Sequence, residues 1–181
     1  GVGNIESAVR QQAFASALYA TAKSLDGTRP VVTNDGWEHG ASDILTLHDY
    51  TQSADELGRK VATLQLAAEG APFNAARQAY ADGYSYGGQP VVFSEFGGIA
   101  FETEKEKGWG YGTSVQDEDE YLTRLASLVH TFTEKDYCCG WCYTQLTDVQ
   151  NEVNGLADEN RVLKTDRERL RAIITGVEQK K

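Results

Sequence analysis

Glu95 is the residue of this sequence best suited to chemistry, because it stands in a stretch that otherwise favours burial. Residues 90–98 read PVVFSEFGG, so a run of apolar residues ends on a carboxylate and two glycines. A glutamate in this position can serve as a nucleophile or as an acid/base group. Alternatively, it caps a loop or pairs with an arginine. Gly97 and Gly98 favour the catalytic interpretation, since glycines allow a sharp turn and the close approach of a substrate.

Two further clusters carry polar and aromatic side chains. His48, Asp49 and Tyr50 are consecutive, and Asp35 and Trp37 lie together in the segment NDGWE. His48 can donate a hydrogen bond to a substrate hydroxyl or to a carboxylate, or it is simply a histidine satisfied within the core. Asp35 and Trp37 are suited to holding and stacking a sugar ring, which has an apolar face and a rim of hydroxyls. Ordinary packing is the alternative for Trp37.

The cysteines predict neither redox nor metal chemistry. Cys138, Cys139 and Cys142 all lie in the segment YCCGWCYTQ, and the last two have C-x-x-C spacing. Structural zinc requires four ligands, and the sequence has no second cysteine pair. We therefore interpret the segment as a buried strand and expect no metal and no other cofactor. Three clustered thiols favour a reducing, cytoplasmic compartment.

Length and charge narrow the class of protein. The sequence has 181 residues and a formal net charge of −10, which suits one acidic globular domain. An acidic chain without a basic cluster is a poor ligand for nucleic acid or an anionic membrane. No apolar run approaches the roughly 20 residues of a membrane-spanning helix. We expect neither nucleic acid nor a membrane as a partner.

Four helices are predicted from apolar residues at three- and four-residue intervals. The first covers about residues 6–25, and the second contains Leu57, Val61, Leu64 and Ala68. The third has the clearest apolar stripe, over residues 121–132, and the acidic run 117–120 marks its start rather than a metal site. The last begins near residue 166, with Thr165 and Glu168 forming a capping box.

Four short apolar runs between these helices predict strands, at residues 30–35, 43–50, 90–96 and 138–145. Alternation of strands and helices favours a parallel α/β sheet. Polar or aromatic residues collect at the carboxyl end of every strand. Both a (β/α)8 barrel and a doubly wound open sheet bind their ligands at that edge. No glycine-rich phosphate-binding loop follows a strand, which argues against a nucleotide site.

Four segments of the chain resemble the catalytic barrel of glycoside hydrolase family 2, the family of β-galactosidases, β-glucuronidases and β-mannosidases. They read KSLDGTRPVVTNDGWE, DILTLHDYTQ, GQPVVFSEFGGIAF and GWCYTQLTDVQNEVNGLADENRVLK, and the resemblance covers the chain from about Asn4 to Lys164. The resemblance implies an α/β fold, namely the C-terminal half of a (β/α)8 TIM barrel, strands 5–8 with their helices. Residues 1–181 would form a single fragment of that catalytic domain.

The same resemblance implies a retaining hydrolase of β-linked glycosides that uses two glutamates. The segment SEFGG matches the nucleophile motif, so the role falls on Glu95. The residues expected to bind substrate are Asp35, Trp37, His48, Tyr50, Thr144 and Gln145. Thr144 and Gln145 stand where some relatives carry an aromatic residue and an asparagine, which leaves the preferred sugar open.

The second glutamate of the family follows the fourth strand in the motif Asn-Glu-Ser-Trp-Gly. This sequence opens GVGNIES, and we interpret Gly1 and Val2 as the residues just after that motif. Glu6 imitates the motif but has one extra residue and no preceding strand, so we do not assign it the acid role. We therefore expect the isolated chain to be inactive. The alternative is a carbohydrate-binding or scaffolding module without turnover.

A half-barrel would leave the strands near Val31 and Cys138 as unpaired edges, and exposed edges pair with other chains. We therefore predict that two copies associate through these edges into a homodimer. Light scattering across a concentration series measures the mass directly. A monomer that persists at high concentration would contradict this prediction.

Overall fold

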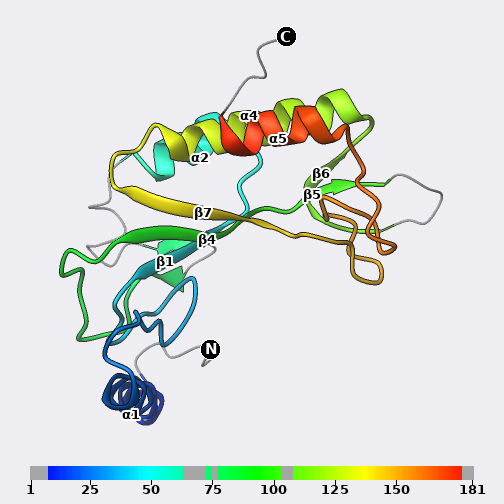
Figure 1. Cartoon of the computed structure of the whole chain (residues 1–181). Coiled ribbons are helices and arrows are strands. Elements are labelled where there is room, and N and C mark those ends of the chain that lie inside the picture. Colours follow the sequence, from blue (N-terminus) through cyan, green and yellow to red (C-terminus); the bar gives the residue numbers. More distant parts are fainter. Residues whose placement is uncertain (1–7, 63–71, 75–76, 103–107, 177–181) are drawn as a thin grey trace. The chain divides into compact units, whose positions relative to one another are not determined.

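The strands of this α/β protein pair into three separate sheets. The computed structural model describes residues 8–62, 72–74, 77–102 and 108–176 (Figure 1). In chain order the elements are α1 (Val9–Leu25), β1 (Leu45–Asp49), α2 (Ala54–Lys60), β2 (Pro72–Asn74), β3 (Arg77–Gln78), β4 (Val91–Gly97), β5 (Ile99–Phe101), β6 (Tyr111–Val115), α4 (Glu118–Thr133), β7 (Cys138–Thr144) and α5 (Arg167–Thr175). The main sheet has the order β1-β4-β7, β2 pairs with β3 antiparallel, and β5 pairs with β6 in parallel.

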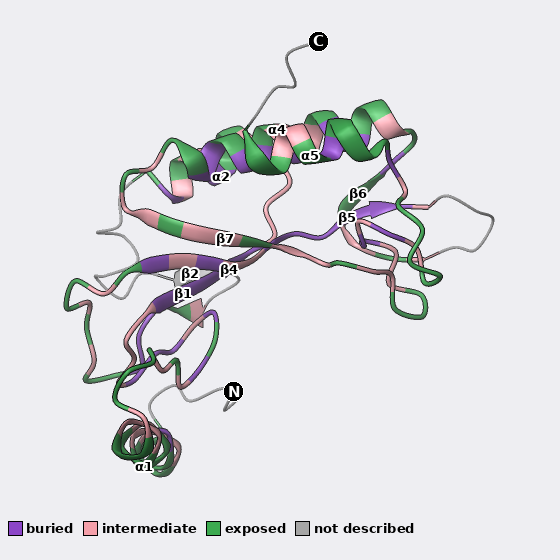
Figure 2. Ribbon diagram, viewed as in Figure 1, coloured by how far each residue is buried: buried purple, intermediate pink, exposed green. Residues whose placement is uncertain are grey.

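The main sheet contains three of the four predicted strands. β1 is buried along its whole length, whereas β4 alternates over its first residues, with Val91 and Phe93 buried (Figure 2). Uninterrupted burial is typical of a strand that is covered on both faces. The two strands are separated by 41 residues of chain yet are neighbours in the sheet, so their carboxyl ends come together.

The strand predicted at residues 30–35 is not formed, and this corrects the sequence-based prediction. Side chains take the place of a backbone ladder there. Val31 N donates to the Asp43 carboxylate at 2.7 Å, Thr33 Oγ1 donates to Ala41 O, and Asn34 Nδ2 donates to Trp37 O. Pro30 also lacks an N–H group. β1 is consequently an outer strand of a three-stranded sheet, and the predicted half-barrel of four strands is not confirmed.

The chain divides into two compact units. The first comprises Gly1–Asp49, Lys60–Glu95 and Asp136–Cys142, and the second comprises Tyr50–Arg59, Phe96–Lys135 and Tyr143–Lys181. The units interleave along the sequence, with β4 and β7 each contributing residues to both. That residues 1–181 form a single fragment of one catalytic domain stays a prediction.

Helix α1 confirms the first predicted helix over its described residues. Ala15 is its buried residue and belongs to a small cluster with Ala81 and Tyr84. Ser16 Oγ and Tyr84 Oη are hydrogen bonded at 3.1 Å, which ties the helix to the loop that precedes β4. α2 ends at Lys60, and the predicted continuation through Leu64 and Ala68 lies outside the described residues.

Helix α4 is the centre of the second unit's core and confirms the predicted apolar stripe. Its buried residues include Tyr121, Leu122, Leu125, Leu128, Val129 and Phe132. Asp117 caps the helix by accepting a hydrogen bond from Glu120 N at 2.8 Å. Phe96 packs edge-on against Phe132, with ring centroids 4.8 Å apart and an interplanar angle of 75°.

Helix α5 lies beside α4 (Figure 1) and begins at Arg167. The predicted capping box is wrong in one residue, because Asp166 rather than Thr165 is the cap. The Asp166 carboxylate accepts hydrogen bonds from Glu168 N and Arg169 N, and its own N–H donates to Glu118 Oε1 on α4. The contact between α4 and α5 therefore decides which residue caps α5. None of the described helices is both long and apolar enough to cross a membrane.

Replacing Phe132 with alanine tests the second unit's core. Its ring is 1% exposed, so truncation removes apolar burial and leaves a cavity that should lower the free energy of unfolding by about 3–5 kcal/mol. Urea unfolding followed by circular dichroism measures the change. Thr123→Ala on the exposed side of α4 is the matched control and should change stability by less than about 0.5 kcal/mol. Equal losses in the two variants would contradict this account of the core.

Candidate active site

Asp35, His48 and Glu95 come together in the first unit, with the imidazole touching both carboxylates. His48 Nε2 lies 2.9 Å from Asp35 Oδ2, and His48 Nδ1 lies 3.4 Å from Glu95 Oε2. The first contact is a hydrogen bond, whereas the second is an ion-pair distance at which the ring nitrogen has no aligned hydrogen bond. The two carboxylates are accessible, with side chains 46% and 38% exposed, while the His48 side chain is only 7% exposed.

Local backbone geometry explains how His48 reaches this position. Gly36 has φ +87°, and a Cβ atom there would lie 2.5 Å from His48 Cγ, so the imidazole lies directly against the backbone. Gly36 N donates to Thr46 Oγ1 at 3.0 Å, which holds the loop against β1. The Trp37 indole also packs against the His48 ring, in an edge-on geometry with ring centroids 5.0 Å apart.

The environment of Asp35 keeps its carboxyl group ionised. Burial by itself acts to raise the pKa of Asp35, but hydrogen bonds from His48, Thr46 and Ser94 outweigh it and hold that pKa well below its usual range. The bond from Ser94 Oγ to Asp35 Oδ1 measures 2.7 Å. Asp35 is consequently an acceptor and a counter-charge, and it is unsuited to donating a proton.

Asp35, His48 and Glu95 also have the composition of a metal site. One ligand atom from each lies within 4.8 Å of the others. The two short contacts, however, use the two different nitrogens of one imidazole, and a single ion can bind only one of them. The arrangement is better described as an imidazole between two carboxylates.

Trp37 connects this cluster to a second ion pair. The Arg77 guanidinium lies over the indole at 5.5 Å from the ring centroid, and Arg77 Nη1 contacts Glu38 Oε1 at 2.8 Å. The Trp37 Nε1 atom is buried and finds no hydrogen-bond acceptor among the described residues. An oxygen-rich ligand would supply such an acceptor.

In the second unit, Tyr50 stacks on Tyr111 with centroids 3.7 Å apart and an interplanar angle of 8°. The two glycines after Glu95 make room for tyrosine rings. A Cβ atom on Gly97 would lie 2.4 Å from Tyr143, and one on Gly98 would lie 2.4 Å from Tyr111. Both glycines have positive φ, of 83° and 61°. Aromatic packing thus accounts for these glycines without the substrate approach that the sequence suggested.

Thr144 is the last residue of β7 and Gln145 follows it, and both belong to the second unit. Gln145 Nε2 donates to Asn154 Oδ1 at 2.9 Å, and Asn154 Nδ2 donates in turn to Glu152 Oε1 at 3.0 Å. The Gln145 amide is therefore part of a network within the loop that follows β7. Thr144 is partly buried at the strand end.

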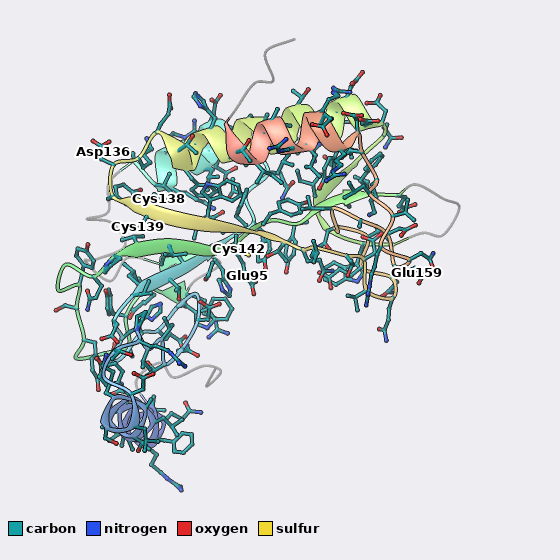
Figure 3. All side chains as sticks on the ribbon, viewed as in Figure 1. Glu95, Asp136, Cys138, Cys139, Cys142 and Glu159 are labelled. Carbon is teal, nitrogen blue, oxygen red and sulfur yellow. The ribbon has the colours of Figure 1, made fainter. Side chains whose placement is uncertain are left out.

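The cysteine segment forms a strand, as predicted, but the strand is not buried. Cys138 is half-buried, Cys139 and Cys142 are exposed, and none of the three forms a disulfide. Their side chains lie along β7 (Figure 3). β7 is an outer strand of its sheet, which explains the exposure. Residues three apart on a strand point to opposite faces with Cα atoms about 10 Å apart, beyond the reach of a disulfide. Cys139 and Cys142 therefore cannot act as a C-x-x-C redox pair in this fold.

Sequence reasoning missed Thr46 and Ser94. Thr46 lies two residues before His48 on β1, so strand alternation placed it on the same face and offered a usable signal. Ser94 meets Asp35 across 59 residues of sequence, and no local pattern could have identified that contact.

Solved structures with a similar fold include glycoside hydrolases. A GH2 β-galacturonidase from Eisenbergiella tayi bound to galacturonate matches 94% of this chain with a TM-score of 0.61 and 16% identity. A β-glucuronidase from Bifidobacterium dentium complexed with coumarin-3-O-glucuronide matches 93% (TM-score 0.60, 18% identity), and one from Faecalibacterium prausnitzii matches 89% (TM-score 0.59, 18% identity). No protein-family model matches the sequence, and no curated protein is significantly similar to it.

This chain spans 31%, 28% and 28% of those three solved chains, respectively. At such low identity the similarity shows that the chain has the fold of a part of these GH2 proteins. The resemblance noted in the sequence is confirmed at that level, and membership of the family stays a proposal.

Asp35→Asn tests the electrostatics of the cluster. Because the folded-state pKa of Asp35 is lowered, its contribution to stability is present above the unfolded pKa of about 3.9 and is lost as the pH falls below that value. The variant should therefore lose less stability than the parent between about pH 5 and pH 2. Thermal unfolding across this range measures the difference. Glu159→Gln, at an exposed loop position, is the control and should keep the parent's pH dependence.

Proposed function

We propose that this chain is part of the catalytic domain of a retaining β-glycoside hydrolase and that Glu95 is the nucleophile. The position of Glu95 near the carboxyl end of β4, beside a histidine that also contacts a second carboxylate, is the observation that carries the proposal. The similarity in fold to parts of GH2 glycosidases supports it. On this proposal β1, β4 and β7 correspond to the last three strands of a (β/α)8 barrel, and residues 1–181 to its C-terminal half.

In the proposed reaction, Glu95 attacks the anomeric carbon of a β-linked sugar. A bond forms between a carboxylate oxygen and that carbon, and the bond to the leaving oxygen breaks with its electron pair. Water then cleaves the glycosyl ester and regenerates the Glu95 carboxylate. The side chain of Glu95 is 38% exposed, so a substrate can reach it. Retaining enzymes require a second carboxyl group about 5–5.5 Å from the first to protonate the leaving oxygen.

Asp35 does not meet the requirements for that second group. Its lowered pKa keeps it ionised, whereas the acid of a retaining glycosidase must hold a proton before the first step. Glu6 lies outside the described residues. We therefore propose that a residue outside these 181 supplies the acid. The isolated chain should then be inactive on glycosides with poor leaving groups, because general acid catalysis alone contributes typically about 10²–10⁴-fold.

The proposed substrate class is β-linked glycosides, with Trp37 among the groups that contact the sugar. The buried N–H of Trp37 would donate to a sugar oxygen. The roles of Tyr50, Thr144 and Gln145 in binding stay predictions, as does the homodimer. No step of this reaction requires a cofactor.

Covalent labelling tests the nucleophile. The natural open reading frame that contains these residues should be expressed and treated with 2-deoxy-2-fluoro-β-glycosides that carry a dinitrophenolate leaving group, which needs little acid assistance. Peptide mass spectrometry should locate the sugar on Glu95, and Glu95→Gln should abolish labelling. The control variant Glu159→Gln should label normally. Labelling of another carboxylate, or sugar binding without any labelling, would overturn the proposal, and the second result would favour a binding module.

A further inference from the structure

We propose that His48 and Asp35 are positioning residues for Glu95 and do not bind the substrate. This inference rests on the proposed function, since it assigns the surroundings of the proposed nucleophile. It also changes the roles that the sequence suggested for both residues, which were contacts to a sugar.

The His48 ring has little capacity left for a substrate. One nitrogen contacts Asp35 at 2.9 Å and the other faces Glu95 at 3.4 Å. One side of the ring lies against the backbone of Gly36, and the Trp37 indole meets the ring edge-on at 5.0 Å. The side chain is 7% exposed. A sugar hydroxyl would have to displace one of the two carboxylates to reach a ring nitrogen.

The Asp35 carboxylate is held in place by two hydrogen bonds. It accepts from His48 through Oδ2 and from Ser94 through Oδ1, at 2.9 and 2.7 Å. Ser94 directly precedes Glu95 on β4, so Asp35 reaches the nucleophile's strand by two routes: through the Ser94 hydroxyl, and through His48 to the Glu95 carboxylate. Two attachments at consecutive residues restrict rotation of the strand end as well as of the side chain.

The imidazole ring can connect the two carboxylates because it has two ring nitrogens. A ring nitrogen that carries a hydrogen can donate it to the carboxylate that it faces. The neighbouring His39 takes no part in this connection, because its own Nε2 bonds Thr46 O at 2.7 Å.

Inactivation kinetics separate positioning from substrate binding. The natural full-length protein is treated with the activated fluoroglycoside over a range of concentrations, which gives the inactivation rate constant and the inhibitor's dissociation constant separately. Asp35→Asn and His48→Gln should each lower the rate constant by about 10–100-fold while changing the dissociation constant less than about threefold. The double variant should be little worse than either single one, because both residues act through one chain of contacts. Ser94→Ala should give a smaller loss in the same direction.

Asp43→Asn is the matched control. Asp43 is also a hydrogen-bonded carboxylate of the first unit, accepting from Tyr19, Lys23 and Val31 N, but it does not contact Glu95 or His48. The Asp43→Asn variant should therefore have a less stable fold but an unchanged inactivation rate constant. A raised dissociation constant with an unchanged rate constant in Asp35→Asn or His48→Gln would overturn the inference and restore a substrate-binding role.

A spectroscopic measurement tests the contact between His48 and Asp35 independently of activity. The 181-residue chain, labelled with ¹⁵N-histidine, should show a slowly exchanging ring N–H proton on the His48 nitrogen that faces Asp35. Asp35→Asn should shift this signal, whereas Asp43→Asn should leave it in place. An unchanged His48 signal in Asp35→Asn would overturn the inference. If the contact is seen but the wild-type full-length protein is never labelled at Glu95, the proposed function fails, and the positioning role fails with it.

Discussion

The pairing of β1 with β4 is the constraint on which the candidate site depends. His48 and Glu95 are 47 positions apart in the chain, and they meet because their strands are neighbours in the sheet and both residues lie toward the carboxyl ends. A register shift of one residue in either strand would turn one of the side chains to the opposite face. The apolar residues Leu45, Leu47, Val91 and Phe93, all nearly inaccessible, give this register its stability.

Burying a polar side chain costs free energy unless a partner replaces its lost contacts with water. Each buried polar residue of β1 has such a partner. Thr46 accepts from Gly36 N, His48 contacts two carboxylates, and Asp49, which is 1% exposed, pairs with Lys60 at 3.3 Å. A buried charge without such a partner would cost several kcal/mol (about 3–5 when one member of a pair is removed). The strand thus holds buried polar side chains, each with a partner, next to the solvent-accessible carboxylates of Asp35 and Glu95.

This chain is similar to parts of the solved glycosidases in its backbone fold and much less so in its sequence. Identities of 16–18% accompany TM-scores near 0.6, so the path of the backbone is shared while most side chains differ. Specificity can therefore not be transferred from the galacturonidase and glucuronidases to this chain.

The sequence by itself determined the local elements. The apolar spacing of α4, the carboxylate that ends the apolar run of β4 and the polar cluster at the end of β1 were all predicted, because each depends on neighbours within one element.

Tertiary structure decided the features that local sequence patterns do not encode. Asp43 and other side chains replaced the expected strand near Val31, Asp166 took the cap through its contact with Glu118, and Ser94 met Asp35 across 59 residues. Contacts between distant segments have no periodic signature in sequence, so the contacts of His48 with Asp35 and Glu95 arise only when β1, β4 and the loop before β1 pack together.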